Sequence, residues 1–439
     1  MTDPIPDLAR VRAFLRPWCD ADVALDCLEV SHVTVGPGGP LRALYEGTGP
    51  DGRVLRLVAQ RVGADEGRRL EAEINRSHLR SHLRSHRRPG SGFVQPAIYA
   101  PELHLLFQVF PADRRLGGLA QAADGGAMAL VLEAALAKRT GAARLAGVGV
   151  DAVRYKPARK CLFRYDLTWA DGPAPRRPAV VYAKLARRTK FERTRDILGQ
   201  LRAAAGGLVF ELPEPLGTVP ELGMELFSQL PGVHLFTLVA DPAFPQLCER
   251  VGAGLRHFHG LPVALGWERD MAATVAHLTD STAEFAALLP AERSRIAALG
   301  LALRAALTAL PPPRLGLTHG DFHGDNILVD GTRIGLVDLE DCAMGDPADD
   351  VGSNWAQLTW HTLRTAARTP IPNLGRQAFL EAYLERTDAE TAARVPTYAA
   401  VHCFLYGYQC LRHPHDPDRY EGAAAMLGAC EHVLEKGLP

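Results

Sequence analysis

A loop between two apolar segments carries the residues whose types and spacing could do chemistry. Residues 319–326 read His-Gly-Asp-Phe-His-Gly-Asp-Asn and follow an apolar segment. A short apolar run then leads to Asp-Gly at 330–331, and a second apolar run ends at Asp338. An Asp-Gly pair between two such runs predicts a β-hairpin. Because a hairpin brings its two ends together, we expect Asn326 and Asp338 to lie side by side.

These two side chains can hold a cation and leave Asp321 for a substrate. An amide oxygen beside a carboxylate is a hard-oxygen site that suits Mg²⁺, which keeps several waters and takes other ligands from phosphates. Asp321 lies five residues before Asn326 and can reach a hydroxyl held opposite a metal-bound phosphate. Phosphoryl transfer needs one carboxylate for the acceptor and cations for the phosphates. The loop therefore predicts a site for phosphoryl transfer.

The same residues resemble the signature of the aminoglycoside phosphotransferase/choline kinase-like family. That signature is His-Gly-Asp, four residues, Asn, and then an Ile/Val-Asp pair. The chain has these residues at 319–321, Asn326 and 337–338. The stretch 345–351, Gly-Asp-Pro-Ala-Asp-Asp-Val, is also similar to a stretch that follows the signature in the family. The resemblance covers roughly residues 140–439, and the chain lacks the HRD, DFG and APE motifs of protein kinases.

The resemblance implies a role for each residue of the signature. Asp321 would be the catalytic base, and His319 would brace the loop around it. Asn326 and Asp338 would hold Mg²⁺. Asp346 and Asp350 would be structural anchors.

The kinase-like fold also requires a lysine on an upstream strand, which holds the α- and β-phosphates, and an acid on the next helix, which orients that lysine. Residues 180–184 read as an apolar strand that ends in Lys184. For the acid, Glu192 is our first choice and Asp196, about one helical turn further on, is the alternative.

Two further segments are expected to contact the nucleotide. Residues 223–232 resemble the family's linker between lobes, where the adenine would bond the backbone near Ser228 and Leu230. The loop 156–160 contains no glycine, so backbone amides alone are not expected to cradle the phosphates. The candidates for supplying positive charge there are Lys156, Arg159 and Lys160.

The first 125 residues repeat the plan of the next hundred. Each copy is a helix, a strand-turn-strand, a polar Asp-Gly loop, a further strand, a charged helix and an apolar strand that ends in proline. Matched positions in the same order argue for duplication, although two unrelated segments of similar composition remain the alternative. The first copy has Gln60 where the second has Lys184, so we expect it not to bind ATP productively. The matched pairs are Pro37 and Pro157, Tyr45 and Tyr165, and Glu46 and Asp166.

We therefore expect an α+β chain with a two-lobed protein kinase-like fold, preceded by a degenerate copy of its small lobe. Residues 1–125 would form the degenerate cap domain and residues 126–232 the nucleotide-binding small lobe. Residues 233–439 would form the helical catalytic and acceptor-binding lobe, with long helices at 244–259, 269–310, 355–385 and 398–411.

The composition limits the partners that we expect. The 439 residues carry a formal net charge of −1, which gives no basis for a nucleic-acid or membrane partner. No apolar run reaches the roughly 18–20 residues that cross a bilayer, and the N-terminal residues lack an apolar signal core. The eight cysteines include no Cys-x-x-Cys pair and are expected to be reduced. We expect a cytoplasmic protein and leave its oligomeric state open.

Two features stay open in the sequence. Residues 76–88 place His78, His82 and His86 along one helical stripe, which could bind a polyanion or a metal or simply form a solvated basic face. The acceptor pocket is expected near residues 355–361 and 398–412. Its candidate lining residues, which could equally pack the core, are Trp355, Trp360, His402, Tyr406 and Gln409.

Together these features predict a Mg²⁺-dependent small-molecule kinase. It would transfer the γ-phosphate of ATP, or of GTP, to a hydroxyl of a small polar acceptor such as an aminoglycoside, an amino alcohol or a sugar. The alternative is a nucleotide-binding pseudokinase or scaffold protein without turnover.

Overall fold

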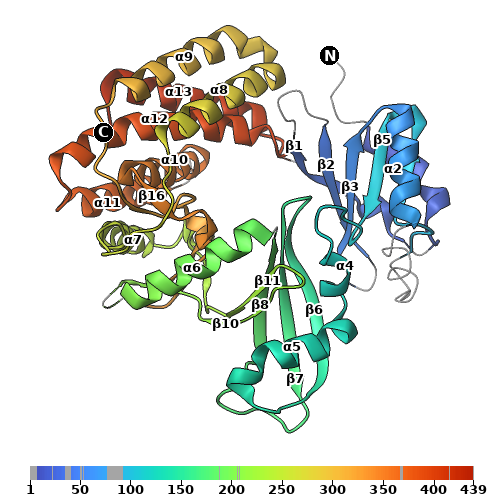
Figure 1. The fold of residues 1–439 in the computed structure, drawn as a ribbon. Helices are drawn as coiled ribbons and strands as arrows, with labels where there is room; N and C mark the ends of the chain where they lie inside the picture. Colours follow the sequence, from blue (N-terminus) through green and yellow to red (C-terminus); the bar gives the residue numbers. More distant parts are fainter. Residues whose placement is uncertain are drawn as a thin grey trace. The chain divides into compact units, whose positions relative to one another are not determined.

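In the computed structural model the chain folds into two compact units, and Figure 1 shows their helices and strands. The structure describes residues 7–438 except 22, 35–40, 50–51, 53, 77–91, 187, 205, 207, 366–368 and 415, and it leaves out the side chains of residues 188–192. The histidine stripe predicted at residues 76–88 therefore lies almost entirely outside the described residues. The first unit consists of Met1–Phe191, Glu214–Gln229 and Arg412–His415, and the second of Glu192–Pro213, Leu230–Leu411 and Asp416–Pro439.

The first unit begins with an antiparallel five-stranded sheet in the order β1-β2-β3-β5-β4. Helix α1 (Leu8–Leu15) precedes this sheet, and α2 (Ala64–Arg76) connects β3 to β4. The rings of Tyr45 and Phe107, both fully buried, lie 6.2 Å apart in its core. The strands are β1 (Glu29–Thr34), β2 (Arg42–Thr48), β3 (Val54–Arg61), β4 (Ala97–Ala100) and β5 (Leu105–Val109).

A second antiparallel five-stranded sheet has the equivalent order, β6-β7-β8-β11-β10. Helix α5 (Gly125–Thr140) precedes it, and α6 (Arg188–Ala204) follows β8. Tyr45 pairs with Val30 in the first sheet as Tyr165 pairs with Val150 in the second. The shared order supports the predicted duplication, which stays a prediction. The strands are β6 (Leu145–Lys156), β7 (Lys160–Trp169), β8 (Val180–Ala186), β10 (Pro215–Val219) and β11 (Met224–Ser228).

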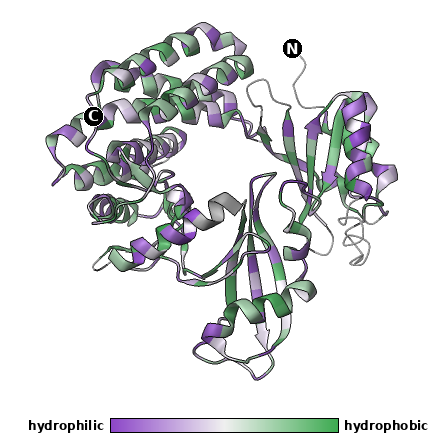
Figure 2. Ribbon diagram, viewed as in Figure 1, coloured by the Kyte–Doolittle hydropathy of each residue, from purple (hydrophilic) through white to green (hydrophobic). Residues whose placement is uncertain are grey.

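Buried and more exposed side chains alternate along β7, which explains how the second sheet packs. Every second residue of β7, from Cys161 to Trp169, is buried, because successive side chains of a strand point to opposite faces. Helix α5 covers this face with Met128, Leu132 and Leu136, which recur at helical spacing. The green colouring of α5 in Figure 2 shows its hydrophobic character.

The second unit is mostly helical and contains two small sheets. The four-stranded sheet has the order β12-β14-β15-β9, and β13 pairs with β16 in the other. No described helix is long and apolar enough to cross a membrane. The strands are β9 (Phe210–Glu211), β12 (Val233–His234), β13 (Gly316–Thr318), β14 (Ile327–Asp330), β15 (Arg333–Leu336) and β16 (Ala343–Gly345). The longer helices are α7 (Phe244–His259), α8 (Met271–Leu288), α9 (Arg293–Ala309), α10 (Pro347–Thr365), α11 (Ile371–Leu384), α12 (Ala389–Cys410) and α13 (Arg419–Lys436).

The α+β class is confirmed, and the predicted helix α7 has the expected bounds. Two long helices were wrongly predicted as continuous. The segment 269–310 is interrupted at Pro290 between α8 and α9, and the segment 355–385 is divided near Pro370 between α10 and α11. Proline lacks the N–H that a helix interior needs, so it starts a new helix at these points.

Candidate active site

The hairpin predicted from the Asp-Gly pair is confirmed and places two candidate ligands together. Ile327 pairs with Leu336 in the β14–β15 ladder. Beyond that pair, the Val337 N–H donates to the Asn326 carbonyl at 3.0 Å. Asp338 therefore follows directly after the partner of Asn326, at the open end of the hairpin. Its backbone is left-handed, with φ of 63°, which turns the chain at this point.

The side-chain amide of Asn326 is fixed from inside the loop. Asn326 is 2% exposed, and its Nδ2 donates to the Asp321 carbonyl at 2.9 Å. Because the nitrogen faces the loop, Oδ1 is the atom that remains for a metal. A carboxylate and an amide oxygen suit Mg²⁺, which usually takes one or two protein ligands along with waters and phosphates. Among the described residues, no group of three or more His, Cys, Asp or Glu could hold a metal ion.

His319 braces the loop with both ring nitrogens. Its Nε2 lies 3.0 Å from the Val337 carbonyl, and its Nδ1 accepts the Asp321 N–H at 3.3 Å. These contacts fix the orientation of the ring. The ring is fully buried and lies in an edge contact with Phe322, at 5.8 Å between centroids. The bracing role of His319 stays a prediction, and these contacts are the ones that it would use.

His323 contacts Asp321 from within the same loop, and the sequence analysis did not assign it this role. Its Nδ1 accepts the Asp325 N–H at 3.2 Å, and its Nε2 lies 3.2 Å from the side-chain nitrogen of Asn326. Nε2 lies 3.5 Å from the Asp321 Oδ1. Burial by itself raises the pKa of the Asp321 carboxyl, but His323, together with His319, outweighs this effect and holds that pKa well below its usual range. Asp321 is therefore an ionised, oriented carboxylate.

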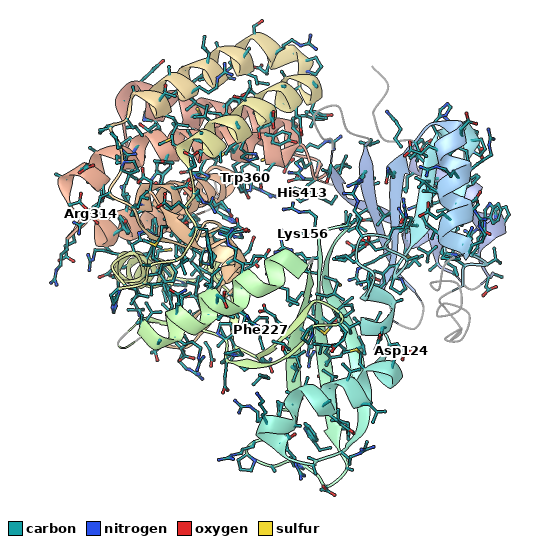
Figure 3. The ribbon with its side chains drawn as sticks, in the orientation of Figure 1. Asp124, Lys156, Phe227, Arg314, Trp360 and His413 are labelled. Carbon is teal, nitrogen blue, oxygen red and sulfur yellow. The ribbon has the colours of Figure 1, made fainter. Side chains whose placement is uncertain are left out.

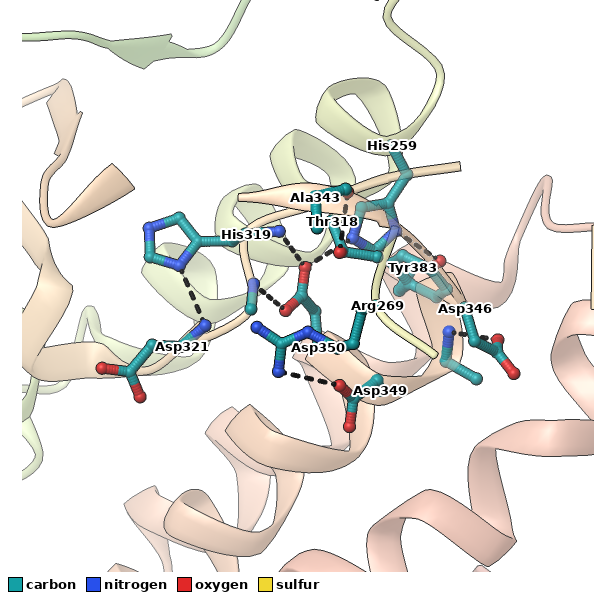
Figure 4. Close-up of polar contacts among 12 residues, drawn as sticks. His259, Arg269, Thr318, His319, Asp321, Ala343, Asp346, Asp349, Asp350 and Tyr383 are labelled. Atoms are coloured by element: carbon teal, nitrogen blue, oxygen red, sulfur yellow. Dashed lines mark hydrogen bonds and ion pairs between the residues drawn. The ribbon is translucent and has the colours of Figure 1, made fainter. Parts of the chain in front are cut away.

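Asp350 on α10 fixes the start of the loop (Figure 4). Its carboxylate accepts the His319 N–H at 2.6 Å and the Gly320 N–H at 2.8 Å, and it lies 3.1 Å from Nε2 of His259. The Tyr383 hydroxyl lies 2.8 Å from the other nitrogen of that ring. Burial raises the pKa of the Asp350 carboxyl, but His259 and the loop outweigh burial and keep it below its usual range.

Gly320 shows why the loop needs glycine at this point. Its φ is 82°, and a Cβ there would come within 2.5 Å of the Asp341 carbonyl. A side chain is therefore excluded both by the backbone conformation and by space. The glycine of the His-Gly-Asp motif lets the chain turn while Asp350 accepts its N–H and that of the preceding His319.

Two further acids near the loop, Asp346 and Asp349, lie close to basic side chains. Asp349 lies 2.7 Å from Nε2 of His402 and 3.6 Å from Nη1 of Arg269. Asp346 forms a buried ion pair with Arg394 at 2.6 Å. The anchoring role of Asp346 and Asp350 stays a prediction. The sequence did not single out Arg269 or Arg394, since neither stands in a motif.

Lys184 lies in the first unit, inside β8 and not at its end as predicted, because the strand continues to Ala186. Its neighbours Val181, Ala183 and Leu185 face the core, and Lys184 faces the other side of the sheet. Directly opposite it on β11 stands Glu225, which is 5% exposed. Side chains opposite each other in an antiparallel pair share a face.

Glu225 is thus an acid that the sequence analysis missed. A glutamate in an apolar strand has no local signal, and strand pairing alone puts it across from Lys184. The side chain of Glu192, our first choice, lies outside the described residues. Asp196, the alternative, is exposed and lies 3.6 Å from Arg195.

Ser228, at the end of β11, is tied to the chain that precedes the sheet's edge strand. Its N–H donates to the Glu214 carbonyl, and its Oγ accepts the Glu214 N–H, both at 2.8 Å. Because the N–H of Ser228 is already used in this bond, only the Ser228 carbonyl remains for the expected hydrogen bond to adenine. Leu230 is half-buried and packs beside Gly335 of the hairpin. For both residues the nucleotide contact stays a prediction.

The residues considered for an acceptor pocket differ in burial. Trp355 is 3% exposed and lies under the guanidinium of Arg376, at 5.0 Å from the ring centroid. Trp360, labelled in Figure 3, lies 5.9 Å from the ring of Tyr406. These tryptophans pack the core of the second unit, whereas Gln409 is exposed.

Comparisons with known proteins agree with the motif. A family model described as the phosphotransferase enzyme family matches residues 166–395. A viomycin phosphotransferase from Streptomyces vinaceus is 32% identical over 170 residues, which are 35% of this chain and 58% of that protein. The chain therefore matches little more than half the length of this relative.

Solved structures give more distant matches. A choline/ethanolamine kinase family protein from Mesorhizobium loti is 18% identical and has a TM-score of 0.43, over 66% of this chain and 88% of the other. A macrolide 2′-phosphotransferase from Brachybacterium faecium is 21% identical, with a TM-score of 0.40, over 66% and 96% of the two chains.

Proposed function

The chain belongs to the phosphotransferase enzyme family, and on that premise we propose that it transfers the γ-phosphate of ATP or GTP to a hydroxyl of a small polar acceptor with the help of Mg²⁺. The observation that carries this proposal is the loop geometry around Asp321. One ionised carboxylate is oriented by His323, and two candidate metal ligands stand at the open end of the adjoining hairpin.

Asp321 would bind and orient the acceptor hydroxyl. The lowered pKa of Asp321 makes its carboxylate a weak base. Asp321 would therefore contribute more by positioning the acceptor hydroxyl than by removing the hydroxyl proton early in the reaction. The transition state of phosphoryl transfer is loose, and the hydroxyl needs to lose its proton only late. The ring of His323, whose Nε2 lies 3.5 Å from Oδ1 of Asp321, would keep the carboxylate turned toward the acceptor.

Asn326 and Asp338 would hold Mg²⁺ through Oδ1 and a carboxylate oxygen. The ion would neutralise charge on the β- and γ-phosphates. The fixed Nδ2 of Asn326 presents Oδ1 in a defined direction, and the left-handed backbone at Asp338 sets the direction of its side chain. Because both side chains are already restricted, binding of Mg²⁺ would cost less of their conformational entropy.

Lys184 would contact the α- and β-phosphates, with Glu225 as its orienting acid. The cross-strand position of Glu225 supports this assignment in place of Glu192 or Asp196. The equivalent strand of the first sheet has Gln60 opposite Leu106, so it lacks both charges. This difference supports the proposal that residues 1–125 bind no nucleotide. Residues 126–232 would then be the nucleotide-binding lobe and residues 233–439 the catalytic and acceptor-binding lobe.

A panel of hydroxylated acceptors tests the proposal. The panel contains viomycin, an aminoglycoside, a macrolide, choline and simple sugars, each with ATP or GTP and Mg²⁺. We expect nucleotide consumption that depends on one acceptor and is lost in Asp321→Asn. A matched control is Asp330→Asn, since Asp330 is an exposed acid of the same hairpin. Binding of Mg-ATP without consumption on a broad panel would favour the pseudokinase or scaffold alternative.

A further inference from the structure

The turn between β6 and β7 is held by a residue that lies outside the nucleotide-binding sheet. Asp113 follows β5 of the first sheet and is 5% exposed. Its Oδ2 accepts the Tyr155 hydroxyl at 2.7 Å and the Ala158 N–H at 2.6 Å. Its Oδ1 accepts the Arg115 N–H at 2.8 Å, which fixes the carboxylate from its own side.

The backbone of this turn has a conformation that its sequence does not favour. The Arg159 N–H donates to the Lys156 carbonyl at 3.1 Å, and Ala158 has φ of 60°. A proline at the second position and a positive φ at the third are typical of a type II turn, in which glycine is the usual third residue. A Cβ disfavours this conformation. The charge-assisted bond from the Ala158 N–H to Asp113 offsets that cost.

The turn places two cations side by side. Lys156 and Lys160 are cross-strand partners at the last register position of the β6–β7 ladder, and Figure 3 marks Lys156 at the end of its strand. Like charges directly opposite each other destabilise an antiparallel pair. Their placement at a tight turn suits an anion with several oxygens, such as a nucleotide di- or triphosphate.

Packing between the two sheets makes Asp113 a rigid support. The ring of Phe110 lies edge-on to Tyr155 at 5.1 Å, and Leu116 and Leu119 share one hydrophobic core with Phe163. Burial and, to a smaller extent, the nearby Asp113 carboxylate raise the pKa of the Tyr155 phenol well above its usual value. The phenol therefore stays a donor to Asp113 at physiological pH.

We propose that Asp113 is a positioning residue for the nucleotide phosphates, which it serves by holding the glycine-free turn at Lys156–Lys160 in its left-handed conformation. The first sheet would thus support the nucleotide site of the second, although it has no counterpart of Lys184. This inference rests on the proposed function, since it requires that the turn contacts the phosphates of ATP or GTP.

Calorimetric titration of the full chain with AMP-PNP and Mg²⁺ tests the inference. We expect Asp113→Ala to raise the dissociation constant about tenfold, which corresponds to the loss of one charge-assisted hydrogen bond. Asp113→Asn keeps an acceptor oxygen, so a smaller rise is expected. The double variant Asp113→Ala/Ala158→Gly should recover most of the affinity, because glycine adopts the turn without support. Asp124→Ala removes a helix-capping carboxylate of the same unit and serves as control.

Each outcome decides between the claims. If the wild-type chain binds no nucleotide, both the proposed function and this inference are wrong. If the wild type binds and Asp113→Ala binds equally well, the inference alone is wrong. If Asp113→Ala binds weakly and Ala158→Gly restores nothing, Asp113 does not act through the turn, and the inference is again wrong. Should Asp113→Ala fail to fold, Asp113→Asn with and without Ala158→Gly gives the same comparison.

Discussion

The carboxylate of Asp350 accepts the backbone N–H of His319 at 2.6 Å, across a sequence separation of 31 residues. This bond joins the first turn of α10 to the loop that carries Asp321. With the second bond to Gly320, it satisfies two successive N–H groups that would otherwise be buried without partners. The helix thereby determines the shape of the loop.

Asp350→Asn should therefore lower both stability and turnover. An amide has one acceptor oxygen and turns its NH₂ toward a donor, so at least one loop N–H loses its partner, at a cost of about 1–3 kcal/mol. We expect a lower denaturation midpoint and a large loss of kcat. The control Asp388→Asn alters a helix cap at the start of α12, away from the loop. Unchanged turnover in Asp350→Asn would contradict the positioning role.

The pH dependence of stability should change in the same variant. The folded-state pKa of Asp350 is lowered, so its contribution to stability is present above the unfolded pKa of about 4 and is lost as the pH falls. Asp350→Asn removes this pH-dependent contribution to stability. The difference in unfolding free energy between wild type and variant should therefore shrink below about pH 4. Urea titrations at several pH values measure the effect.

His323→Ala should shift the acid limb of the activity profile. In the wild type, the ring of His323 helps to lower the pKa of Asp321, so the carboxylate stays ionised even at acid pH. Without the ring, burial dominates and the pKa rises. We expect the acid limb of kcat to move to higher pH in His323→Ala. An acid limb at the same pH in both proteins would show that Asp321 does not control it.

Lys184→Met and Glu225→Gln should weaken nucleotide binding in parallel. If Glu225 orients Lys184, each single change removes the same interaction, and the double variant should be little worse than either single one. We expect the KM for ATP to rise, while Asp196→Asn, a change at an exposed acid, leaves it unaltered. Additive effects of the two changes would show that Glu225 acts independently of Lys184.

Two ion pairs of similar geometry should differ in their contribution to stability. Arg394 pairs with Asp346 at 2.6 Å with both side chains almost fully buried, and Arg333 pairs with Glu211 at 2.6 Å at the surface. Arg394→Ala leaves a buried carboxylate without its cation and should cost about 3–5 kcal/mol. Arg333→Ala should leave the denaturation midpoint nearly unchanged, since solvent screens the exposed pair. Equal losses in the two variants would contradict this explanation.

Local chemistry in the sequence was sufficient to predict the hairpin and its ends. The Asp-Gly turn fixed which residues meet, because register in a hairpin follows from the turn. Proline positions within the predicted long helices also carried the information that they break, although periodicity alone suggested continuous helices. The strand order of the two sheets was consistent with the repeat in the sequence.

Long-range contacts depended on the tertiary structure. Glu225 comes opposite Lys184 because β8 and β11, which are separated in the sequence by α6, β9 and β10, pair in one register. Asp113 reaches Ala158 from another sheet, and His259 reaches Asp350 from another helix. None of these pairs has a short spacing or a motif.

The proximity of Asn326 and Asp338, with Asp321 in the adjoining loop, could be predicted from the sequence alone, because all three lie within one local segment whose geometry follows from a single turn. The groups that orient these side chains became apparent only from the tertiary structure. A hydrogen bond between distant residues depends on how helices and sheets pack, and packing is a property of the whole core rather than of any segment.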